Sequence, residues 1–420
     1  MNKKAIQALN PVPLPADSEP LGENAKISDL DGFRTAAVHC GLKTASDKPS
    51  DIGLIVAETG AIAAGVFTKN RFVAAPVIIS KSHLKASSTI RAIIVNAGNA
   101  NCATGERGLE DARSMCARTA SEIGCDPSAV LVASTGVIGR AMPIDRILSG
   151  VDQLCRAASK KKSTGDFSKA ILTTDLVVKR AGILVKPKKG QPYRIIGCAK
   201  GSGMIAPNLG TMLAFIATDI RVERGALQTA LESAASETFN CATVDGDTST
   251  NDTAFLLSNE TGRSLEKTDQ AQFAAALKWV CGTLAAKIVA DGEGASRTMV
   301  VCVGGAKNDS DARAAAYAIA HSPLVKTALS GGDPNWGRIA AAAGRSGAVF
   351  SPDELSITIG GVDLLKNGEP TGYKAKDAAR AMSADVVLVS VTLGRGPGAA
   401  HFLTCDLTHG YVTINADYHT

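Results

Sequence analysis

A glycine-rich loop that leads into a threonine is the part of this sequence best suited to do chemistry. The loop reads Lys200-Gly-Ser-Gly-Met-Ile-Ala-Pro-Asn-Leu-Gly-Thr211, and a mostly apolar run follows it to Ile220. Because Gly210 has no Cβ, its backbone can take strained angles and present its carbonyl carbon to the Oγ of Thr211. Attack by this hydroxyl would cause an N-to-O acyl shift, which forms an ester between Gly210 and the Thr211 side chain. Hydrolysis of that ester would cut the chain before Thr211.

Such a cut would give Thr211 a free α-amine next to its own hydroxyl. An α-amine has a reference pKa of about 7.7 to 8.0, so near neutral pH it can take the proton from that hydroxyl. The nucleophile would then carry its own base. The alternative is a glycine turn followed by a buried strand in which Thr211 only packs, and the spacing alone favours this alternative.

The loop closely resembles the self-cleavage site of the ornithine acetyltransferase family, also called bifunctional glutamate N-acetyltransferase. The likeness covers residues 29–420, and a series of further motifs stands in the family's order. These motifs are Gly32-Phe33 with Gly41-Leu-Lys43, Ala64-Gly-Val-Phe-Thr68 with Ala75-Pro76, Val95-Asn-Ala-Gly-Asn-Ala-Asn101, Ser134-Thr-Gly-Val-Ile-Gly139, Thr173-Thr-Asp175, Thr243-Val-Asp-Gly-Asp-Thr-Ser-Thr-Asn-Asp252, Asp291-Gly-Glu-Gly294, Asp333-Pro-Asn-Trp-Gly-Arg338 and Tyr411-Val-Thr-Ile-Asn-Ala-Asp-Tyr418. So many matches in order are hard to obtain by chance.

The resemblance implies an enzyme of arginine biosynthesis in which Thr211 is the nucleophile. N-acetylornithine would acetylate Thr211, and glutamate would then take the acetyl group in a ping-pong cycle. A second activity, acetylation of glutamate from acetyl-CoA, stays open. The chain would be cut between Gly210 and Thr211 into α and β chains. The family has alanine before the threonine where this chain has Gly210, so cleavage is expected but its rate is open.

The resemblance also makes Thr135 and Gly136 the oxyanion hole. Each hydrogen-bond donor aimed at a developing alkoxide contributes about 2.7 to 4 kcal/mol. Without the resemblance, an ordinary strand-to-helix turn would be the better interpretation of this segment. Lys200 matches the lysine beside the nucleophile, where a cation would lower the pKa of the freed α-amine and could hold a carboxylate. A lysine in a surface loop is the alternative.

The remaining residues implied by the resemblance bind the substrate. Glu293 would hold the side-chain ammonium of an ornithine-like substrate, although Asp291-Gly-Glu-Gly294 also suits a solvated helix exit. Thr173 or Thr174, Asn415 and the last residue, Thr420, would contact the amino-acid part of the substrate. The alternative for residues 415–420 is a frayed end, as chain termini commonly are.

Composition argues against several other classes of function. The formal charge is 45 − 40 = +5, and only 4% of the residues are aromatic. Both are low for binding nucleic acid, which needs basic stripes or stacking platforms. Asp245, Asp247 and Asp252 break the calcium-loop pattern and are interpreted as a hydrogen-bonded polar loop, so we expect no metal. We expect no bound cofactor, with acetyl-CoA open as a co-substrate.

The cysteines and the apolar runs indicate where the protein works. Ten cysteines occur without a CxxC pair, which predicts reduced, mostly buried thiols and a cytoplasmic location. The apolar run 204–220 is interrupted by Pro207, Asn208 and Asp219, so no membrane-spanning helix is expected. The N-terminus fits neither a signal peptide nor a transit peptide.

Short apolar runs alternate with amphipathic segments, which predicts an α/β fold. Strands are expected near 52–57, 92–95 and 130–133, and also at 299–303, 355–359, 386–393 and 411–414. The chain is divided into an extended or disordered tail at 1–28, a catalytic domain at 29–297 and a C-terminal α/β domain at 298–420. The resemblance implies that the catalytic domain is a layered αββα sandwich, and it suggests a heterotetramer of two α and two β chains.

Two other functions fit parts of the pattern. An autoproteolytic aminopeptidase or amidase of similar fold would use water as the acyl acceptor instead of glutamate. A non-catalytic amino-acid-binding protein would stay intact at 43.1 kDa. Cleavage before Thr211 separates the enzymes from the binding protein, and dependence on glutamate separates the two enzymes.

Overall fold

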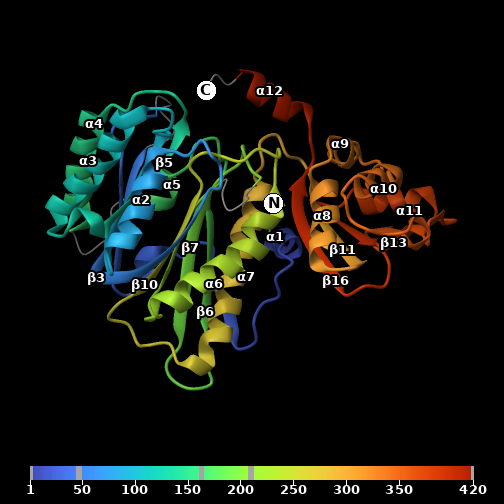
Figure 1. The fold of residues 1–420 in the computed structure, drawn as a ribbon, viewed down its shortest axis with the longest axis horizontal. Coiled ribbons are helices and arrows are strands. Elements are labelled where there is room, and N and C mark those ends of the chain that lie inside the picture. Colours follow the sequence, from blue (N-terminus) through green and yellow to red (C-terminus); the bar gives the residue numbers. More distant parts are fainter. Residues whose placement is uncertain (1–2, 44–49, 160–164, 207–211, 418–420) are drawn as a thin grey trace.

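The computed structural model describes residues 3–43, 50–159, 165–206 and 212–417 (Figure 1). The predicted roles of Gly210, Thr211 and Thr420 lie outside these ranges. Within them, the chain forms one large sheet and one smaller sheet, each covered by helices. The predicted mixed α/β class is confirmed.

The larger sheet splays into two layers at the long strand β3 (Ile52–Phe67). Along one edge of β3, the first half pairs with β2 (Phe33–Val38) and the second half pairs with β10 (Thr253–Asn259). The described strand order is β1 (Ser18–Pro20), β6 (Lys179–Val185), β7 (Tyr193–Lys200), β8 (Leu213–Thr218), β10, β3, β4 (Ile90–Asn99) and β5 (Val130–Val137), with β2 beside β3. A register shift between Val56 and Ala61 marks the place where the two layers part.

The alternation of side chains along the strands explains why the layers stack. Ile93 of β4 and Phe215 of β8 point into a shared core between the layers. Their neighbours Ile94 and Ile216 point the other way, each into a core formed with helices. Apolar residues on both faces of a strand require a cover on each side. The layers are therefore helix, sheet, sheet, helix, as predicted.

Helices cover the outer face of each layer (Figure 1). The helices of the first layer are α2 (Ala75–Ala86), α3 (Gly105–Ile123) and α4 (Ile144–Ala158), and those of the second are α6 (Arg224–Glu237) and α7 (Gln270–Ala290), with α5 (Phe167–Ala170) a short turn beside β2. The stretch 267–290 is long and apolar enough to cross a membrane by length and composition. It is a core helix here, because Leu277 and Leu284 are fully buried against the sheet.

The N-terminal segment was predicted to be an extended or disordered tail, and this is wrong for Lys3–Leu9, which form a helix. Residues Lys3–Leu9 form the helix α1, and Leu9 is buried in the same core as α7. Residues Ser18–Pro20 form the edge strand β1, which pairs antiparallel with β6. Tertiary contacts stabilise a segment too short to form a helix alone.

The smaller sheet belongs to the C-terminal part of the chain. Its described strands, in order, are β14 (Glu369–Pro370), β13 (Val362–Lys366), β12 (Ser356–Ile359), β15 (Val386–Thr392), β11 (Thr298–Ala306), β16 (Gly398–Cys405) and β9 (Ala242–Thr243). Its helices are α8 (Asp309–Ala320), α9 (Pro323–Gly331), α10 (Trp336–Gly344) and α11 (Ala375–Met382). Strand β9 comes from residues before the expected domain boundary at 297. The chain on the N-terminal side of that boundary therefore supplies the edge strand of the smaller sheet, next to β16.

The last described residues form a helix where a strand was predicted at 411–414. Residues His409–Asp417 form α12, which leaves the smaller sheet and reaches back toward the larger one (Figure 1). The alternation of Val412 and Ile414 with polar residues favours a strand in the sequence. A strand needs a partner edge, and residues 412–417 are instead exposed to solvent.

Candidate functional site

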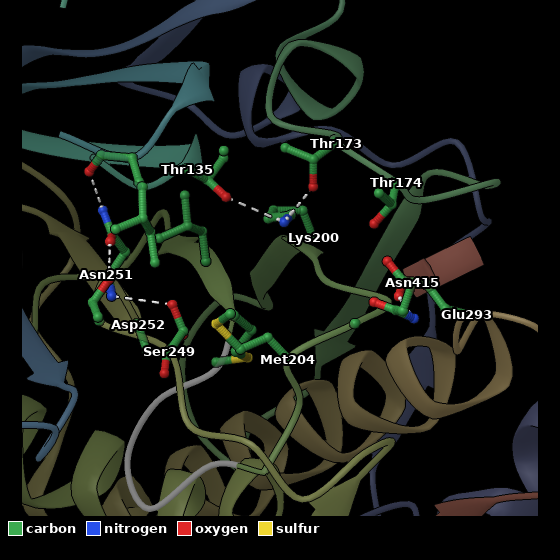
Figure 2. Close-up of a pocket in the computed structure, with 17 residues that line it drawn as sticks. Thr135, Thr173, Thr174, Lys200, Met204, Ser249, Asn251, Asp252, Glu293 and Asn415 are labelled. Carbon is green, nitrogen blue, oxygen red and sulfur yellow. Dashed lines mark hydrogen bonds between the residues drawn. The ribbon is translucent and has the colours of Figure 1, made fainter. Parts of the chain in front are cut away.

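A pocket of about 190 Å³ gathers the predicted site residues that the structure describes (Figure 2). The predicted residues that line it are Thr135, Gly136, Thr173, Thr174, Lys200, Glu293 and Asn415. They come from separate parts of the chain, including β5, β7 and α12. Met212 and Leu213, the next residues after the predicted nucleophile Thr211, line the same pocket.

Lys200 ends β7 and links two of the threonines. Its Nζ donates to the Oγ1 of Thr173 at 2.7 Å and to the Oγ1 of Thr135 at 3.2 Å (Figure 2). Burial lowers the pKa of Lys200, and the nearby Asp175 carboxylate opposes this shift. The side chain is thus a buried amine in the pocket, and the alternative of a solvated loop lysine is wrong.

The backbone at Gly136 is built in a way that only glycine allows. Its φ is 130°, and a Cβ there would lie 2.3 Å from the backbone carbon of Gly98. The pairing of β4 with β5 shifts register beside Gly98, so the two strands approach closely at this point. The resulting bulge places Thr135 and Gly136 at the pocket wall.

A second wall of the pocket was missed by sequence reasoning. Asn251 donates from Nδ2 to the carbonyl oxygens of Ser134 at 2.9 Å and Ala100 at 2.5 Å. It therefore ties the loop before β10 to the strand that carries Thr135. The signal available was the motif 243–252, which the resemblance singled out without giving its residues a role.

Glu293 lies at the end of the pocket toward α12. Its Oε2 accepts from the Nδ2 of Asn415 at 3.0 Å, and its backbone N–H donates to the carbonyl of Ser202 at 2.8 Å. A Cβ on Gly203 would come within 2.4 Å of this carboxylate, so the glycine makes room for it. The half-buried carboxylate is suited to bind a cationic group.

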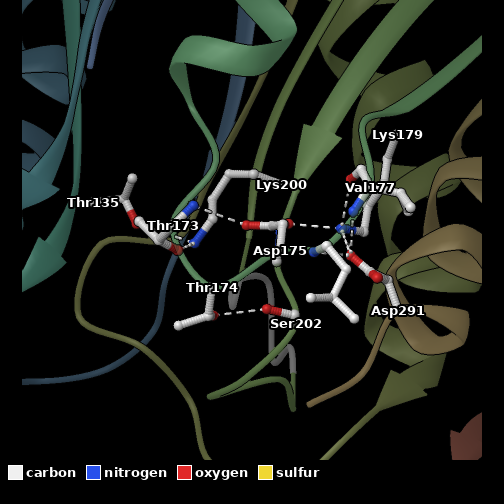
Figure 3. A network of polar contacts seen from close by, with 11 residues as sticks. Thr135, Thr173, Thr174, Asp175, Val177, Lys179, Lys200, Ser202 and Asp291 are labelled. Carbon is white, nitrogen blue, oxygen red and sulfur yellow. Dashed lines mark hydrogen bonds and ion pairs between the residues drawn. The ribbon is translucent and has the colours of Figure 1, made fainter. Parts of the chain in front are cut away.

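A buried ion network lies behind Lys200 (Figure 3). Lys179 is fully buried, and its Nζ contacts an oxygen of Asp175 at 2.6 Å and an oxygen of Asp291 at 2.5 Å. Asp175 also accepts from the backbone N–H of Gly201 at 2.6 Å and of Thr173 at 3.0 Å. The network therefore holds the backbone of Gly201, next to the pocket lysine, and that of Thr173, which the lysine contacts.

The charge state of Asp175 predicts how stability depends on pH. Burial alone would raise its pKa, but Lys200, Lys179 and a backbone N–H hold the pKa well below the usual value. A depressed carboxyl pKa stabilises the folded state above the unfolded pKa of about 3.9, and this contribution is lost as the pH falls through the folded pKa. We expect Asp175→Asn to lower the urea midpoint at pH 7 and to have a smaller effect below about pH 4. An equal effect at both values would contradict this assignment.

The polar loop with several aspartates is hydrogen bonded, as predicted. Both carboxylate oxygens of Asp245 accept backbone N–H groups, from Met204 at 2.6 Å and from Ile205 at 2.8 Å. Among the described residues, no group of three or more histidine, cysteine, aspartate or glutamate side chains is placed to hold a metal ion. All ten cysteines lie in the described ranges, and each is a free thiol.

Comparison with known proteins decides the family. The sequence model of the ArgJ family matches residues 34–420. The chain belongs to the ArgJ family. The "Arginine biosynthesis bifunctional protein ArgJ" of Chlorobaculum tepidum is 45% identical over 391 residues, which cover 92% of this chain and 96% of that protein. The protein of the same name from Dehalococcoides mccartyi is 44% identical over 401 residues, covering 94% and 98%.

Among solved structures, a crystal structure of the arginine biosynthesis bifunctional protein argJ from Bacillus halodurans is 44% identical. The match covers 50% of this chain and 100% of the solved chain, with a TM-score of 0.48. As a member of the ArgJ family, the protein is an enzyme, a transferase of arginine biosynthesis. The predicted family is confirmed. The roles of the individual pocket residues stay predictions.

Proposed function

We propose that this ArgJ-family enzyme moves an acetyl group from N-acetylornithine to glutamate through an acetyl-Thr211 intermediate. One observation carries the proposal. The pocket places a buried amine, Lys200, and a carboxylate, Glu293, around a space that is also lined by Met212, the residue after Thr211. N-acetylornithine has a carboxylate that the Lys200 side chain could bind and a side-chain ammonium that the Glu293 carboxylate could bind.

The first step is self-cleavage. The Oγ of Thr211 attacks the carbonyl carbon of Gly210, and the C–N bond breaks while the ester bond forms. Water then hydrolyses the ester, which leaves a carboxylate on Gly210 and a free α-amine on Thr211. That amine can now act as the base for its own hydroxyl.

Transfer then proceeds in two halves. The Thr211 hydroxyl attacks the acetyl carbon, its proton passes through the α-amine to the leaving nitrogen, and ornithine departs. The amine of glutamate attacks the acetyl ester, and N-acetylglutamate leaves as the Thr211 hydroxyl regains its proton. In both halves, negative charge develops on the acetyl oxygen, where donors from Thr135 and Gly136 would stabilise it.

The two substrates place different demands on Glu293. The side-chain ammonium of N-acetylornithine can pair with this carboxylate directly. Glutamate presents a carboxylate at the same end, so it needs a donor there, and the amide of Asn415 is the hydrogen-bonding group beside Glu293. Lys200, with Thr173 and Thr174, would hold the part of the substrate that both amino acids share.

No bound cofactor is needed, because Thr211 itself carries the acyl group. Acetyl-CoA would act as a second acetyl donor for the same threonine, in keeping with the word bifunctional in the names of the relatives. An assembly of two α and two β chains and a cytoplasmic location complete the proposal.

Isotope transfer tests the reaction. The purified protein is mixed with N-acetylornithine labelled in the acetyl group, and the label is expected on a fragment that begins at Thr211. Added glutamate should then remove the label as N-acetylglutamate. Release of labelled acetate at a rate that ignores glutamate would instead support an amidase, and an intact chain that takes up no label would support a binding protein.

Gly203→Ala is expected to weaken binding of N-acetylornithine. The new Cβ would push the Glu293 carboxylate aside, because it would lie within 2.4 Å of it. A hydrogen bond to a charged group is worth about 1.5 to 3 kcal/mol, so KM should rise by roughly tenfold or more. Steady-state kinetics measure the change. Gly304→Ala, where a Cβ meets nothing within 4 Å, should leave KM as it is, and an unchanged KM in both variants would contradict the role of Glu293.

A further inference from the structure

The loop 243–252 forms hydrogen bonds with residues 204–206, which come just before residues 207–211. The Oγ1 of Thr243 donates to the carbonyl of Ile205 at 2.9 Å, and the Oγ1 of Thr248 donates to the carbonyl of Ala206 at 2.8 Å. Asp245 accepts the backbone N–H groups of Met204 and Ile205. These contacts fix every residue from 204 to 206 through its backbone.

The chain directly after this loop also contacts Met212, on the other side of residues 207–211. Thr253, the residue after this loop, donates its backbone N–H to the carbonyl of Met212 at 3.0 Å. From there β10 continues parallel to β8, with Thr253 opposite Leu213. Residues 243–253 therefore set where the chain stands at Ala206 and again at Met212.

The loop is itself held in place by a third segment. The Oγ1 of Thr68 donates to the carbonyl of Ser249 at 2.8 Å, and the Nδ2 of Asn70 donates to the carbonyl of Thr248 at 2.9 Å. Met204 has a φ of 55°, a left-handed conformation that residues other than glycine seldom adopt. A non-glycine residue keeps such a conformation only where its surroundings enforce it, and Asp245 accepts its N–H.

We propose that Asp245 and Thr248 are positioning residues for the proposed cleavage before Thr211, because they fix the backbone of residues 204–206 that leads to it. The inference rests on the proposed self-cleavage and adds to it the residues that align the bond. Neither side chain reacts. Their effect is on the geometry of attack, and a misplacement of about 1 Å can cost about 10²-fold in rate.

Asp245→Asn is the first test. An amide keeps one oxygen acceptor but places an NH₂ donor where the other oxygen accepts a backbone N–H, so the contact with Met204 or the contact with Ile205 must break. Cleavage of freshly made chain, followed by gel densitometry, is expected to be about 10- to 100-fold slower than in the natural sequence. Asp247→Asn is the matched control, because the contact of Asp247 with Asp245 uses its backbone N–H and is kept.

Thr248 provides a second test that does not alter charge. Thr248→Val removes the hydroxyl that reaches Ala206 with little change of shape, and should slow cleavage, whereas Thr248→Ser should restore most of the rate. Rescue by serine separates positioning from a general loss of folding. Thermal unfolding of uncleaved Thr211→Ala carrying each change checks that the fold persists.

The outcomes separate this inference from the proposed function. If the natural chain never cleaves, both fail together. If the natural chain cleaves and Asp245→Asn and Thr248→Val cleave at the same rate as it does, the positioning role is overturned while the self-cleavage stands. Slower cleavage in both variants, with rescue by serine, supports the role of the loop.

Discussion

Thr211→Ala is expected to leave the chain intact at 43.1 kDa and without transferase activity. Alanine has no hydroxyl to attack the Gly210 carbonyl, so neither the ester nor the new α-amine forms. The natural chain should instead give two fragments of about half that mass, with one beginning at residue 211. Loss of the nucleophile should lower the transfer rate by at least about 10³-fold. Gel electrophoresis, terminal sequencing and the acetyl-transfer assay measure these effects.

Thr211→Ser is the matched control, because it keeps the hydroxyl and removes only a methyl group. It should cleave and transfer, at reduced rates. An intact Thr211→Ala chain that transfers acetyl groups as fast as the natural protein would overturn the mechanism. So would active natural protein in which no chain begins at residue 211.

Lys179→Met is expected to cause the largest loss of stability among the single changes considered. Lys179 is fully buried between Asp175 and Asp291, within 2.6 Å of one carboxylate and 2.5 Å of the other (Figure 3). Its removal leaves two buried carboxylates without their shared cation. Breaking a buried ion pair by removing one partner costs about 3 to 5 kcal/mol, so the free energy of unfolding should fall by about that much.

Activity should fall in the same variant for a geometric reason. Asp175 accepts the N–H groups of Gly201, which follows the pocket lysine in sequence, and of Thr173, whose hydroxyl accepts a hydrogen bond from that lysine. Lys186→Met is the control, because Lys186 and Glu19 form an ion pair with side chains 49% and 61% exposed. Its loss should change stability by no more than about 1 kcal/mol in urea unfolding. Equal effects of the two substitutions would contradict the structural role of Lys179.

Much of the site was predictable because its chemistry is written in short motifs. Thr135, Lys200 and Glu293 each belong to a segment that resembles a family motif, and the structure brings them to one pocket. Asn251 and Met204 also stand in segments that resemble the family, but no role was predicted for either residue. Neither residue type is unusual in its own segment, and both reach the pocket only because the loop 243–252 folds across to β5 and to the chain at 204–206.

Residues 3–9 and 412–414 show that local sequence is also a limited guide to secondary structure. Residues 3–9 lack a strong helical pattern, yet they form a helix because α7 and the sheet bury Leu9. Val412 and Ile414 have the alternation of a strand, yet they lie in α12. Local propensity is weak, and contacts made by distant segments override it.

The order and type of residues in this chain determined the family, the α/β class and the identity of the groups able to react. Those properties depend on covalent chemistry and on the spacing of apolar residues, which are present in the unfolded chain as well. Only the folded protein decided that Lys200 is a buried amine, that Lys179 joins two carboxylates, and that Asp245 holds Met204 in a left-handed turn. Burial and hydrogen bonding arise between segments far apart in sequence, so they depend on the folded arrangement as a whole.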